Sequence, residues 1–146
     1  AQSSLARVLH HLGRREEAQK LLTEVLNTRA RLLGEEHVHV ALTKKDLAAV
    51  HLSEGETEAA AKLLSQALAV LRESKSEGSW EIAEAESLWG AYLTAVGSFE
   101  DAESFLINSY RRLSKIRGSE SIYTRDAYRR LTDHFAARGE PLPASL

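Results

Sequence analysis

Apolar residues recur along the chain at intervals of three, four and seven, which is the spacing of one face of an α-helix. The clearest series run over residues 18–33, 60–71 and 102–116, and a second amphipathic stretch precedes each of them. The pattern predicts a chain built from helices. First helices are expected near 2–12, 39–54, 80–96 and 121–138, and second helices near 15–33, 57–75 and 99–117.

The same pattern returns every 42 residues. Four glycines mark this period, and four alanines follow them at a distance of five residues: Gly13, Gly55, Gly97 and Gly139, then Ala18, Ala60, Ala102 and Ala144. A fixed period of this length is typical of stacked supersecondary units. Each glycine falls at the predicted end of a first helix, where a residue that tolerates positive φ is favoured. We therefore expect each unit to be a helix, a tight turn and a second helix.

Small residues at equivalent positions of the first helices allow the paired helices to approach closely: Ala6, Ala48 and Gly90. A bulky side chain there would push the helix axes apart. A large residue precedes each small one and is expected to pack in the core: Leu5, Leu47, Trp89 and, in the last unit, Leu131. We expect Trp80 to staple the start of its helix, with an exposed interface anchor as the alternative.

These features predict a single domain over residues 1–146, divided into repeat 1 (1–37), repeat 2 (38–79), repeat 3 (80–121), and a capping helix and tail (122–146). Pro141 and Pro143 end the pattern. Polar side chains are expected to face away from the stack on the capping helix: Arg125, Arg129, Arg130 and Asp133. Because the first helix starts later in its unit than its counterparts, repeats are expected to continue upstream, leaving Val8 and Leu12 partly exposed.

The large–small residue pair, the turn glycine and the later alanine resemble the tetratricopeptide repeat. The 42-residue period, together with the run from Leu32 to His37 and the pair Val40-Ala41, is similar to the kinesin-light-chain type of this repeat. Val38 stands where that type usually has proline, and Ser79 and Ser121 replace the histidine. The resemblance implies an all-α fold, an α-solenoid of antiparallel helix pairs that form a right-handed superhelix.

The C-terminal half, residues 80–90 and 125–139 above all, resembles the last repeats of arrays attached to bacterial serine/threonine protein kinases. The kinase itself would lie elsewhere, since no glycine-rich loop, His-Arg-Asp or Asp-Phe-Gly motif occurs in these residues. The resemblance implies a non-catalytic scaffold that binds a peptide or protein segment in a concave groove and is the C-terminal piece of a longer array. The alternative is a regulatory domain of such a kinase that senses a ligand or signal peptide.

The groove positions of the repeat family, transferred to each first helix, give the candidate binding residues: Ser3, Arg7, His10, His11, Lys45, Ala49, Leu52, Ser53, Glu84, Ser87, Ala91, Thr94, Asp126, Arg129 and Asp133. Arg7 and Lys45 are expected to face solvent and, with the two histidines, to attract an acidic segment of the partner. The alternative is that both are solvated charges without a ligand.

The charges balance over the whole chain, with 19 Lys and Arg against 21 Asp and Glu and a net charge of −2. Their distribution is uneven. Residues 77–106 contain seven acidic side chains and no basic ones, whereas residues 107–130 contain seven basic and two acidic side chains. A third hypothesis is nucleic-acid binding through the basic side chains of the 111–130 stretch: Arg111, Arg112, Lys115, Arg117, Arg125, Arg129 and Arg130. Pairing of the acidic and basic stretches across adjacent helices is favoured over this hypothesis.

The remaining chemistry-bearing residues predict no enzyme, cofactor or metal site. The absence of cysteine removes thiolate chemistry and disulfides. His10 and His11 are adjacent and point to different sides of a helix, so they do not converge on one metal. Carboxylate neighbours such as Glu16 and Glu17 lie at helix starts, where negative charge suits the helix dipole. Apolar runs fall far short of the ~18 residues that a membrane-spanning helix needs, and a cytoplasmic location without a membrane partner is expected.

Overall fold

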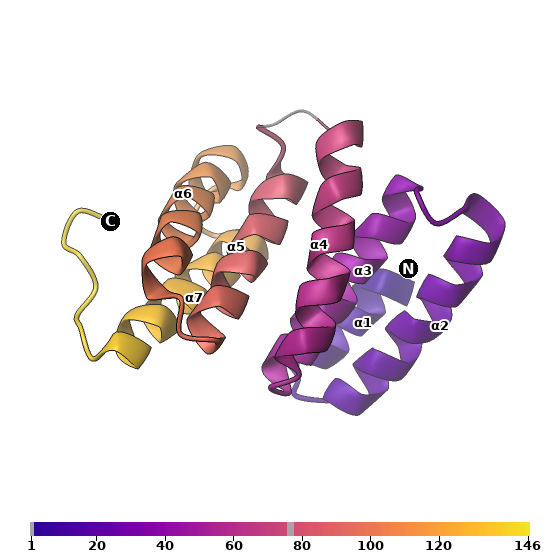
Figure 1. Cartoon of the computed structure of the whole chain (residues 1–146), viewed down its shortest axis with the longest axis horizontal. Coiled ribbons are helices and arrows are strands. Elements are labelled where there is room, and N and C mark those ends of the chain that lie inside the picture. Colours follow the sequence, from indigo (N-terminus) through magenta and orange to yellow (C-terminus); the bar gives the residue numbers. More distant parts are fainter. Residues whose placement is uncertain (1, 76–77) are drawn as a thin grey trace. The chain divides into compact units, whose positions relative to one another are not determined.

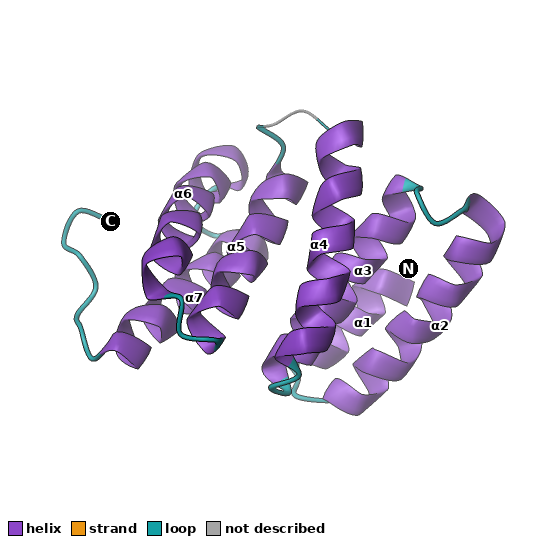
Figure 2. Ribbon diagram, viewed as in Figure 1, coloured by secondary structure: helices purple, strands orange, loops and turns teal. Residues whose placement is uncertain are grey.

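The computed structural model describes residues 2–75 and 78–146, with side chains described from Leu5 onward. The chain divides into two compact units, Ala1–Ser74 and Lys75–Leu146. Every regular element in the described residues is an α-helix (Figures 1 and 2). The observed helices start and end within one residue of the expected positions. None of the described helices is both long and apolar enough to cross a membrane.

The first unit consists of four helices, α1 (Gln2–His11), α2 (Arg15–Leu33), α3 (Val38–Ser53) and α4 (Thr57–Ser74). Each helix packs against the next one in the chain, and α1 also contacts α3 (Figure 1). A single apolar cluster joins Ala6 of α1, Ala18 and Leu22 of α2, and Leu47 and Val50 of α3. The small residues therefore lie in the core, as the pattern predicted.

The second unit contains α5 (Trp80–Ala95), α6 (Phe99–Arg117) and α7 (Ile122–Arg138). Here α6 packs against both of the other helices, and α5 also contacts α7. Gly90 of α5 is needed for this packing, because a Cβ atom there would lie 2.7 Å from Cγ of Leu106 on α6. The last residues form a non-helical tail, so Ala144 is not in a helix, and Leu142 and Leu146 pack on the cluster around Leu131 and Phe135.

The turns confirm the role expected of the periodic glycines. Gly13, Gly55, Gly97 and Gly139 all have positive φ, between 71° and 86°, immediately after a first helix. An L-residue with a side chain rarely adopts this conformation, which is why glycine is favoured there.

Three first helices begin with the same side-chain cap, although the capping residue differs. His37 Nδ1 accepts a hydrogen bond from the backbone N–H of His39, while the hydroxyl oxygens of Ser79 and Ser121 accept from the backbone N–H groups of Ile82 and Tyr123. These residues occupy one position of the 42-residue period. The replacement of histidine by serine therefore preserves the N-cap.

Two expectations for large residues are corrected. Leu5 is 53% exposed rather than packed in the core, because no described helix covers its side of α1, whereas Leu47 and Leu131 are buried. Trp89 is only half-buried, and its ring lies 5.0 Å from that of Tyr92. The exposure expected for Val8 and Leu12 is confirmed, at 53% and 67%.

Candidate functional site

The candidate residues of the first unit are organised by an aspartate on α3. Asp46 Oδ1 lies 3.5 Å from Arg7 Nη2, across the contact between α1 and α3, and 3.7 Å from Lys45 Nζ. Arg7 donates to this oxygen. One carboxylate therefore compensates both of the cations that were expected to form a positive patch.

The expected solvent exposure of Lys45 is wrong. Its side chain is only 2% exposed, and that of Arg7 is 25% exposed. Lys45 belongs to the inner helix α3, which packs against α1, α2 and α4, so its apolar stem is covered. The nearby Asp46 carboxylate offsets part of the cost of burying the ammonium group.

The other candidate residues of the first unit lie around this ion pair. His10 is partly buried and His11 exposed, with their rings edge to face at 5.4 Å, and His11 Nδ1 donates to the Arg7 carbonyl oxygen. Ala49 and Leu52 are partly buried and Ser53 is exposed. Ser3 lies outside the residues whose side chains are described.

In the second unit, polar groups are buried between α5 and α7. Arg130 Nη1 of α7 donates to Ser87 Oγ of α5 at 3.1 Å, and Arg130 is 9% exposed. Glu84 and Asp126 are also buried, at 5% and 8% exposure. Burial lowers the pKa of Arg130, while the charges of Glu84 and Asp126 act in the opposite direction. An arginine stays protonated in proteins, so this site holds a buried cation between two carboxylates.

The burial of Arg130 corrects its assignment to an outward polar face of the capping helix. The neighbouring Arg129 and Asp133 are exposed, and Arg129 Nη1 lies 3.4 Å from Asp126 Oδ1. Successive helical residues are turned by about 100°, so Arg129 and Arg130 point to different sides of α7.

Thr94 and Ala91, the remaining candidates on α5, are partly buried. Thr94 Oγ1 lies 2.9 Å from Nδ1 of His134, a buried residue of α7 that the sequence analysis did not select. The structure thus brings Arg7 and Lys45 together through Asp46, and links Ser87 and Thr94 to α7 through Arg130 and His134.

The three residues that complete these contacts could have been found from the period. Asp46 and Arg130 occupy the same repeat position, one residue after Lys45 and Arg129 in their units. His134 occupies the position of Val50, which is buried in α3. In both cases the signal in the sequence is a polar residue at a repeat position that is apolar in another repeat.

A family model described as Tetratricopeptide repeat matches residues 1–73. The chain belongs to the tetratricopeptide repeat family. A comparison with curated proteins finds no match.

Solved structures share the fold over nearly the whole repeat chain. A Podosopora anserina protein described as a kinesin light chain with nearly identical TPR-like repeats is 23% identical, with a TM-score of 0.73, and the alignment covers 95% of this chain and 66% of that one. A variant of it has a TM-score of 0.71 with the same identity and coverage. BtubC (BKLC) from P. vanneervenii is 22% identical, with a TM-score of 0.67 and coverage of 94% and 54%.

The present chain therefore spans about two thirds or less of the length of these proteins. The likeness confirms the all-α solenoid fold of antiparallel helix pairs and the resemblance to kinesin-light-chain-like tetratricopeptide repeats.

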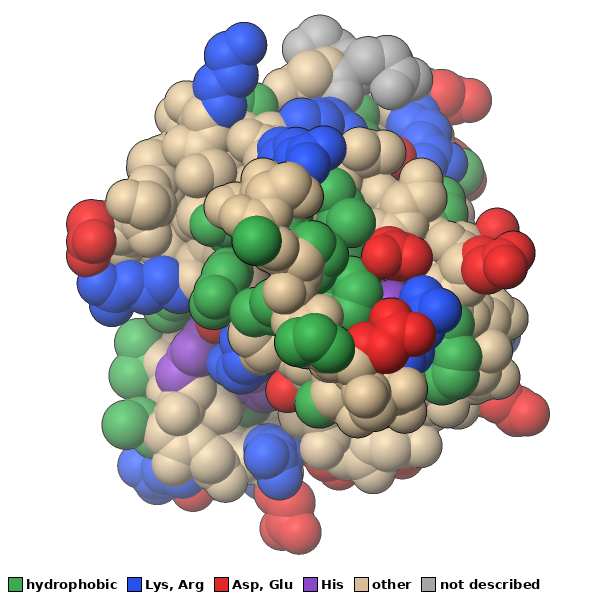
Figure 3. Space-filling view, turned by 90° about the vertical axis from the view of Figure 1, so that its left-hand side faces the viewer, with side chains coloured by type: hydrophobic (Ala, Val, Ile, Leu, Met, Phe, Trp, Pro, Cys, Tyr) green, Lys and Arg blue, Asp and Glu red, His purple; other side chains and the backbone are tan. Residues whose placement is uncertain are grey.

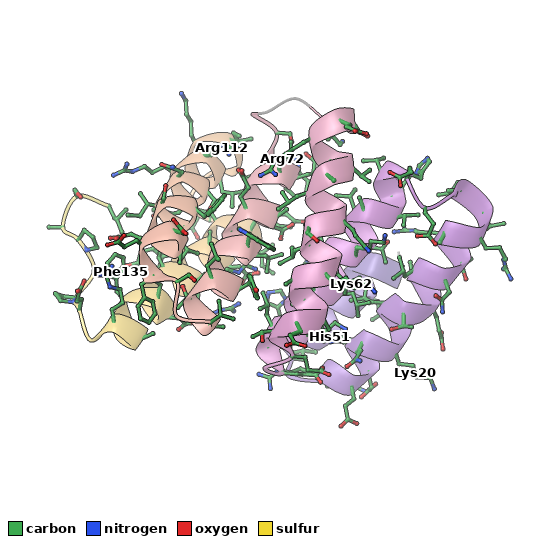
Figure 4. All side chains as sticks on the ribbon, in the orientation of Figure 1. Lys20, His51, Lys62, Arg72, Arg112 and Phe135 are labelled. Atoms are coloured by element: carbon green, nitrogen blue, oxygen red, sulfur yellow. The ribbon has the colours of Figure 1, made fainter. Side chains whose placement is uncertain are left out.

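Ion pairs join adjacent helices of the second unit. Arg112 of α6 (labelled in Figure 4) lies 2.6 Å from Glu86 of α5, and Arg138 of α7 lies 3.2 Å from Glu103 of α6. The expected pairing of the acidic and basic stretches is thus confirmed for Glu86 and Arg112, whereas Arg138 lies beyond the basic stretch. Figure 3 views the end of the molecule that carries α6, α7 and the tail, and shows apolar side chains near its centre with acidic and basic ones around them.

Trp80 contacts the two helices that follow it. Its ring centroid lies 4.6 Å from that of Tyr123 on α7, and the Arg117 guanidinium lies 4.6 Å above it. The ring is half-buried and packs on a cluster that joins Ala83 of α5, Leu113 of α6 and Ala127 of α7, and the staple stays a prediction.

Proposed function

We propose that this tetratricopeptide repeat chain is a non-catalytic scaffold that binds a peptide or protein segment on the faces of its first helices. These faces belong to α1 and α3 in one unit and to α5 and α7 in the other. The tetratricopeptide repeat fold is typically a scaffold for protein interactions. A cytoplasmic location and the role of a C-terminal piece of a longer array remain parts of this proposal.

One observation carries the proposal: charged groups are buried between α5 and α7, where a stable core would use apolar ones. Arg130, Glu84 and Asp126 are each at most 9% exposed. Burying an ion cluster contributes little to stability compared with well-packed apolar residues. The presence of this ion cluster on the first helices supports a role for their faces beyond stabilising the fold. The cluster would fix the orientation of the neighbouring polar side chains.

The partner that we propose carries an acidic segment for the first unit. Arg7 keeps a quarter of its side chain exposed, and His11 is exposed one turn further along α1. Asp46 Oδ1 accepts from Nη2 of Arg7, and this contact fixes the position of a guanidinium that can attract a carboxylate at its exposed side. Arg7, rather than Lys45, is therefore the residue that we expect an acidic partner to contact.

The exposed apolar stripe of α1, formed by Leu5 and Val8, supports a second partner, an upstream repeat of the same chain. Leu5 and Val8 occupy the repeat positions of Leu47 and Val50, which pack against Ala18 and Leu22 of α2. A helix with the apolar face of α2 would cover the stripe in the same way.

The two other hypotheses have less support. Arg112, Arg125 and Arg129 pair with carboxylates, Arg117 lies on an aromatic ring and Arg130 is buried, which leaves little of the basic stretch for phosphates. No observation on the described residues favours a ligand-sensing domain of a bacterial kinase over a scaffold.

A peptide-display selection tests the proposed function. The chain is immobilised and a library of random dodecapeptides is enriched on it, with Arg7→Glu and Arg31→Glu variants in parallel. Arg31 is exposed on the second helix α2 and gives the same change of charge. We expect acidic peptides to be enriched on the wild type and on Arg31→Glu, and to be lost on Arg7→Glu. Enrichment that is equal on all three proteins, or no enrichment, would contradict the proposal.

A further inference from the structure

His134 on α7 makes a specific polar contact with α5. The residue is 0% exposed, and its Nδ1 lies 2.9 Å from Thr94 Oγ1. The Thr94 hydroxyl donates its single proton to the Gly90 carbonyl oxygen at 3.1 Å. Thr94 must then accept from the imidazole, so the neutral ring carries its proton on Nδ1.

The other nitrogen of the ring faces an apolar environment. Nε2 is buried and has no hydrogen-bond partner among the described residues. The ring packs edge to face against Phe99 of α6, at 5.9 Å, and against Phe135, at 4.9 Å (Phe135 is labelled in Figure 4). Protonation would create a charged N–H group at Nε2 without an acceptor, and such a group is costly to bury.

Three charged groups surround the ring from the elements packed against it. Burial lowers the pKa of His134; Glu103 of α6 acts to raise it, Arg138 of α7 to lower it, and Glu140 of the tail to raise it. Arg138 pairs with both carboxylates, at 3.2 and 3.4 Å. Arg138 offsets one of these two negative charges, and the burial of the ring outweighs what remains, so the net effect is a lowered pKa.

Packing alone does not require an imidazole at this position. The equivalent residue of α3 is Val50, which is buried at 1% exposure. The histidine adds a titratable group at a place where valine fills the core of another repeat.

We propose that the contact between Thr94 and His134 is an acid-sensitive latch that holds α7 against α5 and α6. At neutral pH the unprotonated ring closes the latch. At acidic pH the cost of the buried imidazolium favours release of α7, which exposes Leu131 and Phe135. Opening would also disturb Asp126 and Arg129 on the proposed binding face; that consequence rests on the proposed function, whereas the latch itself does not.

The sign of the effect follows from the protonation of the two states. A histidine in the unfolded chain has a pKa of about 6.5 and binds a proton below that pH, whereas buried His134 resists protonation. The stabilisation is therefore complete above about pH 6.5 and is lost as the pH falls toward the lowered folded-state pKa. Between pH 7.5 and 5.5 the unfolding equilibrium constant can rise by up to about tenfold through this group.

Urea unfolding of the full chain at both pH values tests the latch, with the variants His134→Val and His39→Gln. His39 is exposed and serves as the matched control. We expect the unfolding equilibrium constant of the wild type and of His39→Gln to rise several-fold more between pH 7.5 and 5.5 than that of His134→Val. An equal rise in His134→Val would overturn the proposal.

Nitrogen NMR of the wild-type histidines provides a second test that holds even if His134→Val does not fold. We expect His134 to show the Nδ1–H tautomer at pH 7.5 and to remain neutral somewhat below the ordinary histidine pKa of about 6.5. Exchange of the α7 amides, corrected for the intrinsic rate, should accelerate at low pH more than that of α6. Titration of His134 at or above the ordinary histidine pKa of about 6.5 would overturn the latch.

Discussion

Asp46 and Arg130 occupy the same position of the repeat, two periods apart, and each reaches back to the preceding first helix of its unit. Asp46 contacts Arg7 of α1, and Arg130 contacts Ser87 of α5. The charge at this position is reversed between the two units, but its geometric role is kept. Adjacent first helices are thus joined by a polar contact at equivalent places in both units.

Removing the buried guanidinium should be strongly destabilising. Arg130→Ala removes the cation that is buried with Glu84 and Asp126, of which Asp126 keeps its ion pair with Arg129, and we expect a loss of about 3–5 kcal/mol in the free energy of unfolding. Arg129→Ala, one residue away and exposed, should cost less than about 1 kcal/mol. Urea titration measures both; a similar small loss in the two variants would show that Arg130 does not compensate the carboxylates.

Thr124→Val should stabilise the second unit. The Thr124 hydroxyl is buried without a partner among the described residues, and the same repeat position holds Val40 and Ile82. Removing an unsatisfied polar group of nearly equal volume should add about 1 kcal/mol. The control is Thr23→Val on exposed α2 surface, where little change is expected. A destabilised Thr124→Val protein would mean that the hydroxyl has an acceptor.

The period of 42 residues was sufficient to predict the helices and turns, but not which side chains are buried. Helix ends depend on local signals such as the glycine at positive φ after each first helix. Burial depends on the rotation of each helix and on how many neighbours it has, which is why Lys45 on the inner helix α3 is covered although its charge predicted exposure. Arg129 and Arg130 were expected on one polar face, but adjacent helical residues are turned by about 100°, so Arg129 is exposed and Arg130 is buried.

Gly90→Ala should destabilise the contact between α5 and α6, although alanine is the better helix former. The added Cβ would lie 2.7 Å from Leu106 Cγ and 3.3 Å from the Ala102 carbonyl oxygen. Overpacking of this kind costs about 1–3 kcal/mol, which exceeds the gain of about 1 kcal/mol in helix propensity. In a Leu106→Ala background the clash with Leu106 is removed and only the 3.3 Å contact with the Ala102 carbonyl oxygen remains, so the same substitution should cost much less. A double-mutant cycle by thermal unfolding distinguishes these outcomes; additive effects would exclude the clash.

His37→Ser should fold as well as the wild type, whereas His37→Ala should lose about 0.5–2 kcal/mol through loss of the N-cap. Serine supplies the same cap to α5 and α7 at the equivalent position. His39→Ala is the control, because the backbone N–H of His39, and not its side chain, makes the cap hydrogen bond. If His37→Ala is as stable as His37→Ser, the imidazole does not cap α3.

The central claim, that the first helices carry the binding face, is tested most directly by NMR mapping of a bound peptide. The peptide most enriched in the display selection is titrated into ¹⁵N-labelled chain, and the shifts of the backbone amides are followed. We predict the largest changes in α1 and α3, around Arg7 and His11, or in α5 and α7 around Arg129, with α2, α4 and α6 nearly unchanged. Changes confined to α2, α4 and α6 would contradict the proposed binding face.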